Sequence, residues 1–424
     1  MKTVAPMIIS AILFIVFLAL GFPIYISLLT TGIYILVFEM NMDMSSIVLV
    51  LFDSVFKFTL AAVPFFLLAG ALMETSSMAK RMVNWLFYLV SRYRGGAPLT
   101  GVLASEFFAT ISGSSAASTA TVGKILYPEI SKASGESFAL GLLTSCGALA
   151  VVMPPSITMI LYGATASIST GALFLTGIVP ALLIGGLISF YIIWRSNKVE
   201  TAERFSFKEF MLRTKNAFWI LILPAVILGG IYGGLFTPTE AASVAAVYAT
   251  VVAIFIYREM GLRTFFGAIK DAMMLNTQIF IIIASSTVFS QALTFAQVPQ
   301  KLTALTSDLS PVVFILIINL FLLLVGMFFD PTSAVLVITP LLVPICNALG
   351  IDLIQMGLIM TVNLAIGMFT PPFGLNLFVS QGVFKKSMAE VVASLKPFWV
   401  WYLLSLAIIS YIPQLYMWLP DLMK

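Results

Sequence analysis

The sequence predicts an all-α polytopic membrane protein built as an inverted-topology repeat. Of its 424 residues, 60% are hydrophobic and only 9% are charged, whereas soluble domains carry about 25% charged residues. Apolar stretches of about 20 residues, the length that crosses a bilayer as a helix, recur along the chain. The order of these stretches in the first half of the chain is repeated in the second half. A soluble globule is excluded, because so apolar a chain cannot cover itself with polar surface.

Ten apolar stretches are long enough to cross about 30 Å of hydrocarbon as helices. The first follows Lys2 as the core of a signal peptide would. No small-x-small cleavage site comes after it, so we expect an uncleaved first helix. The ten expected crossings are residues 5–21, 24–39, 47–74, 137–163, 170–194, 217–235, 240–257, 274–296, 353–379 and 396–417.

Two further apolar segments, residues 98–131 and 310–349, are interrupted in the middle by small polar residues. The interruptions are Ser112-Gly113-Ser114-Ser115 and Asp330-Pro331-Thr332-Ser333. Each arm has only about 14 to 18 residues, too few for a full span at about 1.5 Å per residue. We therefore expect two re-entrant hairpins.

The two halves of the chain match each other in the order of their elements. Met153-Pro154-Pro155 corresponds to Thr370-Pro371-Pro372, 217 positions further on. Each half contains five crossings, one of them broken at Pro-Pro (137–163 and 353–379), together with one hairpin. An odd number of crossings makes the second half enter the membrane from the opposite side. The predicted repeats, 1–216 and 217–424, have the plan of many secondary transporters.

The basic residues predict the orientation. With the N-terminus outside, eighteen Lys and Arg residues face the inner side, and only Lys2, Lys57, Lys301 and Lys424 face the outer side. Positive charge is enriched in cytoplasmic loops. Both termini are therefore expected in the periplasm or outside the cell. The clustering of basic residues between apolar runs, rather than in a patch, argues against nucleic acid as a partner.

Several activities are excluded by missing residues. The chain contains no histidine, which removes HExxH zinc hydrolases, Ser-His-Asp hydrolases and histidine proton relays. It also lacks a G-x-x-x-x-G-K-[ST] phosphate loop, so any work it performs draws on a gradient or a partner. Cys146 and Cys346 lie inside apolar runs, where we expect small buried side chains and no disulfide or redox role.

The Pro-Pro doublets are the first candidate site. A proline cannot donate a hydrogen bond to the preceding turn, and it suits the first turn of the next helix. Each doublet therefore frees carbonyl groups before it, which suit Na⁺, and presents amide ends after it, which suit a carboxylate. One proline would indicate a simple kink. Two doublets at matched positions, each beside a polar hairpin, favour a functional role.

Polar residues around the breaks and hairpin tips supply the remaining candidates. Asp330 is an expected N-cap of the returning hairpin arm, and an acid so deep in the membrane also suggests a cation site. The Na⁺-binding candidates are Ser112, Gly113, Ser115, Gly147, Met153, Pro154, Asp330, Thr332, Gly367, Thr370 and Pro371. The substrate-binding candidates are Ser114, Ser118, Thr119, Ser156, Tyr162, Asn363 and Asn376. Close helix packing through small residues is the alternative for the serines and threonines.

These motifs resemble the large membrane (M) subunit of tripartite ATP-independent periplasmic (TRAP) transporters. The resemblance covers essentially the whole chain and is carried by G-S-S-A-A-S-T-A at 113–120, M-P-P-S at 153–156, D-P-T-S-A at 330–334 and T-P-P-F-G at 370–374. It implies a Na⁺-coupled elevator in the bacterial inner membrane. Hairpins and broken helices would form a transport domain that slides against a scaffold made of the other helices.

The resemblance also implies partners and a class of solute. The partners are a soluble periplasmic substrate-binding protein and a small four-helix membrane subunit, which we expect as a separate chain. Family solutes are mostly organic anions, and general likeness favours the sialic-acid branch. Na⁺ is the only expected ion, and no cofactor is expected.

Three alternatives follow from the same residues. A stand-alone Na⁺/dicarboxylate carrier shares the repeat and the two hairpins, and transport without a binding protein would distinguish it. An intramembrane enzyme would need a nucleophile and base or paired acids, whereas Asp330 and Glu106 lie in different halves. Glu106 itself is as compatible with packing or snorkelling as with a site. Two hairpins that can act as gates argue against a channel.

Overall fold

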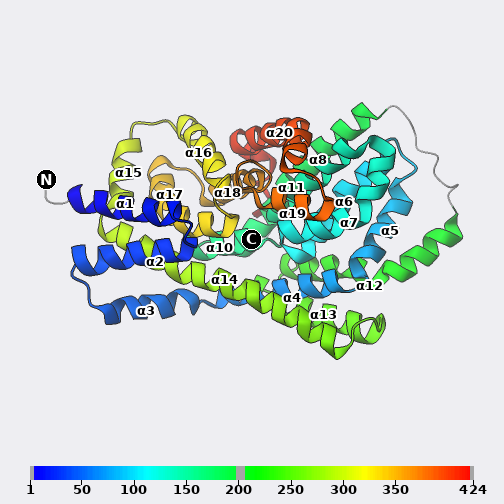
Figure 1. Cartoon of the computed structure of the whole chain (residues 1–424), viewed down its shortest axis with the longest axis horizontal. Coiled ribbons are helices and arrows are strands. Elements are labelled where there is room, and N and C mark those ends of the chain that lie inside the picture. The colour runs from blue at the N-terminus through cyan, green and yellow to red at the C-terminus, as the bar shows by residue number, and fades with distance from the viewer. Residues whose placement is uncertain (1–3, 197–205, 421–424) are drawn as a thin grey trace.

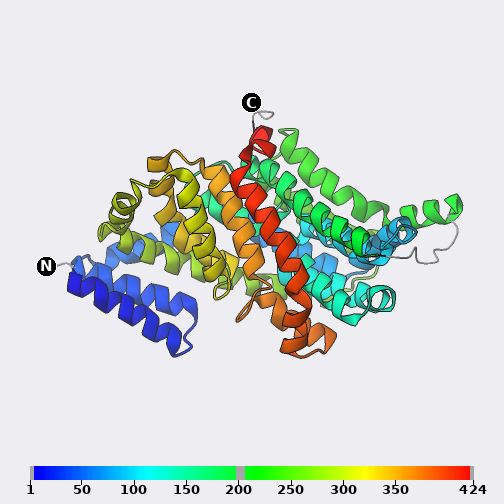
Figure 2. The same ribbon diagram turned by 90° about the horizontal axis from the view of Figure 1, so that it is seen from above.

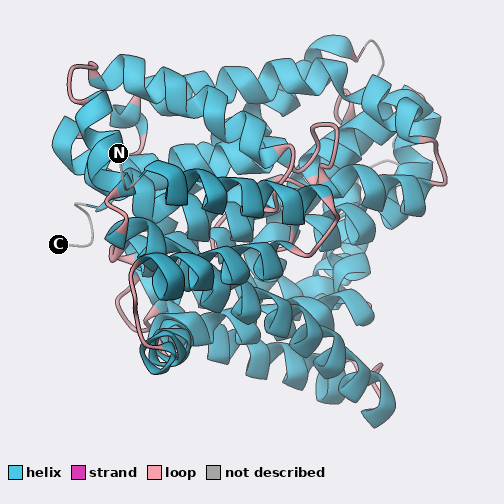
Figure 3. Ribbon diagram, turned by 60° about the vertical axis from the view of Figure 1, so that its left-hand side comes forward, coloured by secondary structure: helices cyan, strands magenta, loops and turns pink. Residues whose placement is uncertain are grey.

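The computed structural model describes residues 4–196 and 206–420, and these residues form helices and loops without a strand (Figure 3). Eight helical segments are long and apolar enough to cross a membrane: Phe58–Thr75, Glu136–Ala166, Thr170–Arg195, Phe207–Tyr232, Pro238–Ile256, Leu262–Phe295, Pro331–Leu349 and Met388–Tyr411. The expected all-helical polytopic membrane protein is confirmed. The ten crossings and the repeat remain predictions.

The first half contains eleven of the described α-helices (Figure 1). The hairpin expected at 98–131 is the pair α6 and α7, and the helix expected at 137–163 is divided into α8, α9 and α10. The bounds are α1 (Val4–Ala19), α2 (Ile24–Tyr34), α3 (Met44–Val55), α4 (Ala62–Thr75), α5 (Met78–Val90), α6 (Gly96–Ser112), α7 (Ser115–Ser134), α8 (Glu136–Cys146), α9 (Leu149–Val152), α10 (Ile157–Ala166) and α11 (Thr170–Arg195).

The second half repeats the helix–turn–helix and the broken helix. The hairpin expected at 310–349 is the pair α16 and α17, and the second broken helix is α18 followed by α19. The bounds are α12 (Phe207–Tyr232), α13 (Pro238–Val251), α14 (Leu262–Phe295), α15 (Val298–Thr306), α16 (Pro311–Gly326), α17 (Pro331–Leu349), α18 (Leu353–Gly367), α19 (Leu375–Phe384) and α20 (Met388–Tyr411). Short η1 (Ile35–Glu39), η2 (Phe58–Ala61), η3 (Val252–Ile256) and η4 (Pro413–Leu415) complete the described elements.

The stretch 47–74, expected as one crossing, is wrong as a single helix. Helix α3 ends at Val55, and a 3₁₀ turn at Phe58–Ala61 leads into α4. The prediction failed because hydropathy measures the length of the apolar run and does not detect a short non-helical segment inside it. A second difference is the length of α14, which begins at Leu262 rather than at the expected position 274.

Helix α14 crosses the molecule and carries one wall of its centre (Figures 1 and 2). It packs against α2, α3, α4 and α17. The first hairpin packs against α8, and α20 packs against α8 and α18. The hairpins and broken helices thus lie together on one side of α14. Lys2, Lys198, Arg204 and Lys424, which entered the charge count, lie outside the described residues.

Candidate functional site

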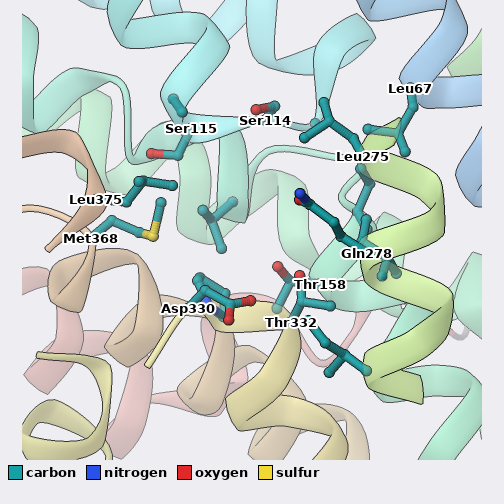
Figure 4. Close-up of a pocket in the computed structure, with 17 residues that line it drawn as sticks. Leu67, Ser114, Ser115, Thr158, Leu275, Gln278, Asp330, Thr332, Met368 and Leu375 are labelled. Carbon is teal, nitrogen blue, oxygen red and sulfur yellow. The ribbon is translucent and has the colours of Figure 1, made fainter. Parts of the chain in front are cut away.

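A cavity of about 280 Å³ lies where the two hairpins and the two broken helices meet α14 (Figure 4). The cavity is mostly apolar, and hydroxyl, amide and carboxylate groups are concentrated in a few positions. Its lining is Leu67, Gly113, Ser114, Ser115, Ala116, Val151, Ile157, Thr158, Leu275, Gln278, Ile279, Ile282, Asp330, Pro331, Thr332, Met368 and Leu375.

The beginnings of four helices converge on this cavity. Lining residues include the first residues of α7 and α10, and the first residues of α17 and α19. The first turn of a helix presents backbone N–H groups and the positive end of the helix dipole. No Lys or Arg is part of the described lining. Among the described lining residues, the source of positive potential is therefore the backbone at these helix beginnings rather than charged side chains.

The first hairpin turns at Gly113, and the glycine has a physical reason. Its φ of +58° is in the left-handed region, where a side chain would be strained, and it forms the C-cap of α6. Ser114 follows as the N-cap of α7 and accepts a hydrogen bond from the backbone N–H of Ala117 at 3.4 Å. The Gly-Ser pair thus ends one helix and begins the next within two residues.

The second hairpin turns at Asp330, which confirms the expected capping role. Its carboxylate caps α17 and accepts hydrogen bonds from the Ser333 N–H at 3.1 Å and the Ser333 hydroxyl at 2.5 Å. Pro331 occupies the first helical position, where its missing N–H costs nothing. The half-buried carboxylate also lines the cavity, so it carries the negative charge of the site.

The two Pro-Pro breaks are held by different hydrogen bonds. In the first break, the chain leaves α9 at Met153 and enters α10 through Ser156, whose hydroxyl donates to Val151 O at 2.5 Å and accepts from Met159 N–H. In the second break, the Phe373 N–H donates to Met327 O of the second hairpin at 3.1 Å. Both Pro-Pro peptide bonds are cis.

Asn376 joins the two halves at the centre. Its Oδ1 accepts from the Ser115 hydroxyl at 2.9 Å, and its Nδ2 donates to Thr144 O at 3.1 Å. All three residues are buried. The second broken helix is therefore bound directly to the first hairpin and to the first broken helix, which makes these segments one packed unit around the cavity.

The structure brings the Na⁺ candidates into two groups. In the first, Gly113 packs against the backbone at Pro155, and Gly147 packs so closely on α7 that a methyl group there would overlap Thr119 Oγ1. In the second, Gly367 packs on the backbone of Gly326 at the end of α16. The first group is Ser112, Gly113, Ser115, Gly147, Met153 and Pro154, and the second is Asp330, Thr332, Gly367, Thr370 and Pro371.

Only some of the Na⁺ candidates face the cavity. Gly113, Ser115, Asp330 and Thr332 line it, whereas the other members lie behind the lining. The Thr370 hydroxyl, three residues past the end of α18, donates to Ile366 O of that helix at 2.7 Å, so it faces back toward α18.

Of the substrate-binding candidates, one lines the cavity. Ser114 lines the cavity, while Ser118, Thr119, Ser156 and Asn376 are buried in the packing behind it. Tyr162 and Asn363 lie away from it. The Tyr162 hydroxyl donates to Leu353 O at 2.8 Å, and the Asn363 Nδ2 donates to Asn319 Oδ1 at 2.7 Å. The last two residues therefore hold helices together.

Sequence reasoning missed one whole wall of the cavity. Leu275, Gln278, Ile279 and Ile282 come from α14, and Gln278 extends its amide group into the cavity opposite Asp330 and Thr332 (Figure 4). Thr158, from the first turn of α10, also lines the cavity and was not among the candidates. The sequence feature that could have identified this wall is the pair of side-chain amides at Asn276 and Gln278 in an otherwise apolar run.

Glu106 is separate from this cavity. It lies on α6, is 7% exposed, and its Oε1 has no hydrogen-bond partner among the described residues. It packs against Gly185 of α11, where a methyl group would overlap the carboxylate. The sequence left its role open, and the structure assigns it this contact.

A polytopic helical fold whose centre is a cavity between hairpins and broken helices belongs to the class of membrane transporters. The match to a known family is direct: residues 11–415 match the family "Tripartite ATP-independent periplasmic transporter, DctM component". The chain belongs to this family. Membership makes it a transporter permease and not an enzyme.

Relatives support the assignment over nearly the full length. The chain is 39% identical to the C4-dicarboxylate TRAP transporter large permease protein DctM of Vibrio cholerae, covering 97% of this chain and 98% of the relative. It is 38% identical to the DctM protein of Pseudomonas aeruginosa, covering 93% of each. It is also 34% identical to the isethionate TRAP transporter permease protein DctMQ of Oleidesulfovibrio alaskensis, over 95% of this chain and 64% of that protein.

A solved structure shows a similar fold. The Alcanivorax borkumensis YdaH transporter superposes with a TM-score of 0.60, covering 88% of each chain at 13% identity. At this identity the likeness concerns the fold alone.

Proposed function

We propose that this protein carries out Na⁺-coupled secondary uptake of a small organic anion with a carboxylate group. The observation that supports this function is the convergence of four helix beginnings on one cavity that has no described Lys or Arg in its lining. Helix N-termini bind carboxylates through backbone N–H groups and the helix dipole. The apolar remainder of the lining suits the hydrocarbon part of such a solute.

The need for Na⁺ follows from Asp330. An anionic solute and this carboxylate share a small cavity, and like charges in a medium of low dielectric constant repel strongly. A cation bound at the hairpin tip would remove this repulsion. Hydroxyl, carboxylate and carbonyl oxygens near the two breaks are ligands suited to a hard cation. Na⁺ is the proposed coupling ion, and the two groups of candidates defined above are its proposed sites.

The names of the relatives guide the choice of solute. Two of the relatives described above are named for C4-dicarboxylates, and another is named for 2,3-diketo-L-gulonate. We therefore put C4-dicarboxylates first, and we keep sialic acid as the second candidate to be tested in the same assay.

The proposed mechanism is an elevator. The hairpins and broken helices form one packed unit through Asn376, and α14 contributes only apolar residues and Gln278 to the opposite wall. Movement of this unit along α14 would carry the cavity across the membrane. We propose repeats at 1–216 and 217–424, ten crossings, and both termini in the periplasm of a bacterial inner membrane.

The proposed partners are a periplasmic substrate-binding protein and a small membrane subunit. Relatives are named as permeases of TRAP transporters, and the DctMQ relative is longer than the part matched by this chain. We propose that a separate small subunit supplies the additional part.

The test is uptake by proteoliposomes that contain this chain and its small subunit. Succinate and N-acetylneuraminate are supplied with their candidate binding proteins, with and without an inward Na⁺ gradient. The proposal expects uptake only with both the gradient and a binding protein. Uptake without a binding protein would instead indicate a stand-alone carrier, and uptake that ignores the Na⁺ gradient would contradict Na⁺ coupling.

A further inference from the structure

A second cavity, of about 220 Å³, lies beside α14 and contains a lysine. It combines one ammonium group with several hydroxyl groups and an apolar remainder. Its lining is Ser54, Lys57, Leu60, Ala164, Thr165, Ile283, Thr287, Ser290, Leu336 and Pro340.

The second cavity is lined by three of the helices that line the first, further along each of them. On α14 the central cavity uses residues 275–282, and the second cavity uses 283–290. The two stretches are centred about eight residues apart, which is about 12 Å at about 1.5 Å per residue. On α10 the lining moves from the first turn to Ala164 and Thr165, and on α17 it moves from the first turn to Leu336 and Pro340. A solute between α14 and the hairpin unit would pass from one cavity to the other.

Lys57 has unused capacity to bind an anion. Its ammonium donates to Ala164 O at 3.3 Å, and no carboxylate of the described residues lies within 4.0 Å of it. An ammonium group carries three donors. A backbone carbonyl does not neutralise its charge, so the second cavity contains a net positive charge that the central cavity lacks.

Three of the hydroxyl groups in this cavity are already used within their own helices, which leaves Ser290. Ser54, Thr165 and Thr287 donate to carbonyl groups of their own helices at 2.7 to 2.8 Å. No hydrogen bond from the Ser290 hydroxyl is described, so it is the hydroxyl available to donate to a bound anion beside Lys57. The rest of the lining is mainly apolar, as a short hydrocarbon chain requires.

We infer that this cavity is a second solute site, in which Lys57 and Ser290 bind a carboxylate group on its way to the central cavity. That the bound anion is the transported solute rests on the proposed function. Lys57 lies on the periplasmic side in the proposed orientation. The site would receive the anion by its charge and pass it to the helix beginnings next to Asp330.

Cysteine labelling tests the site without a gradient or a partner. Thr287→Cys, at a lining position that is not one of the two proposed anion ligands, is made in the full chain, whose two natural cysteines are buried. Relative to their rates with a free thiol, we expect an anionic thiosulfonate to be favoured over a cationic one by at least about fivefold, because Lys57 attracts it. Succinate should slow the reaction, and its neutral diamide, succinamide, should not.

Lys57→Gln is the decisive variant. Glutamine still offers an N–H group to Ala164 O but removes the charge, so a purely structural role would survive. We expect the variant to lose both the preference for the anionic reagent and the protection by succinate. Lys301→Gln, on α15 and outside the cavity lining, is the matched control and should keep both.

In the labelling assay, three results would overturn the inference: no protection by succinate, equal protection in Lys57→Gln, or protection supplied by phosphatidylglycerol nanodiscs with no further effect of succinate. The last result would assign the cavity to a lipid phosphate.

The uptake assay separates this inference from the proposed function. Intact protection without Na⁺-driven uptake would refute the function alone. Uptake with wild-type kcat/KM in Lys57→Gln would refute the second site alone, since about a tenfold loss is expected when a charge-assisted hydrogen bond is removed.

Discussion

Asp330 is an N-cap in the structure and a cation ligand under the proposed function, and a single substitution can separate the two. As a cap, its carboxylate accepts from the Ser333 N–H and hydroxyl, and asparagine caps helices about as well as aspartate. As the proposed cation ligand, it would contribute a full negative charge to the cavity. Asp330→Asn therefore keeps the first role and removes the second. Alanine would remove both, at a cost of about 1 kcal/mol for the cap alone.

The expected loss can be estimated from the position of the carboxylate. Two unit charges about 4 Å apart attract by about 4 kcal/mol at an effective dielectric constant of about 20. The amide oxygen of asparagine retains part of this attraction through its dipole. We take the contribution of a hydrogen bond to a charged group, about 1.5 to 3 kcal/mol, as the scale of the loss. The Na⁺ concentration for half-maximal uptake should therefore rise about 10- to 100-fold.

Asp352 provides a matched control within the same chain. It caps α18 by accepting from the Ile354 N–H at 2.7 Å and the Gln355 N–H at 3.3 Å, and it lies outside the cavity lining. Uptake is measured in proteoliposomes over a range of Na⁺ concentrations, and folding is checked by thermal unfolding. Asp352→Asn should leave the Na⁺ dependence unchanged. If Asp330→Asn behaves like Asp352→Asn, the carboxylate of Asp330 is only a cap.

Three further changes test other parts of the structure. Gly147→Ala would overlap the start of α7 and should destabilise the protein by about 1 to 3 kcal/mol, whereas Gly186→Ala has no atom within 4 Å to meet; equal melting temperatures would contradict the packing. Replacing Pro371-Pro372 with alanines should let α18 and α19 close over the freed carbonyls and raise the Na⁺ concentration needed for uptake; an unchanged Na⁺ response argues against cation binding there. Single cysteines at the exposed Lys132 and Lys301 should react with impermeant reagents from the cytoplasmic and periplasmic sides, respectively, and the reverse pattern would invert the orientation.

The hairpins and breaks were predictable because short-range chemistry determines them. Gly113 at positive φ, Ser114 as an N-cap and Pro331 at the first helical position each act within a few residues. The capping role of Asp330 was predicted for the same reason. Such signals do not depend on what the rest of the chain does, so one sequence was sufficient to locate them.

The lining of the cavity was harder to predict because it depends on packing between distant segments. Gln278 reaches the cavity only because α14 crosses the hairpin unit, and no local pattern fixes that crossing. Tyr162 and Asn363 were chosen for their polar groups near the breaks. Their hydrogen bonds to Leu353 and Asn319 show that polar groups in a helix bundle also serve to hold helices together.

The arrangement also gives a physical reason why ion and solute binding would be coupled. Each turn or break ends one helix and begins another, so free carbonyl groups and free N–H groups lie within a few residues of each other. A cation at the carbonyl side and an anion at the N–H side would then face each other across the same short segment. Each would lower the free energy of the other by direct attraction, and Asp330 alone would repel the anion. Under the proposed function, a loaded cavity without Na⁺ is therefore the unfavourable state, and the coupling needs no separate relay between distant sites.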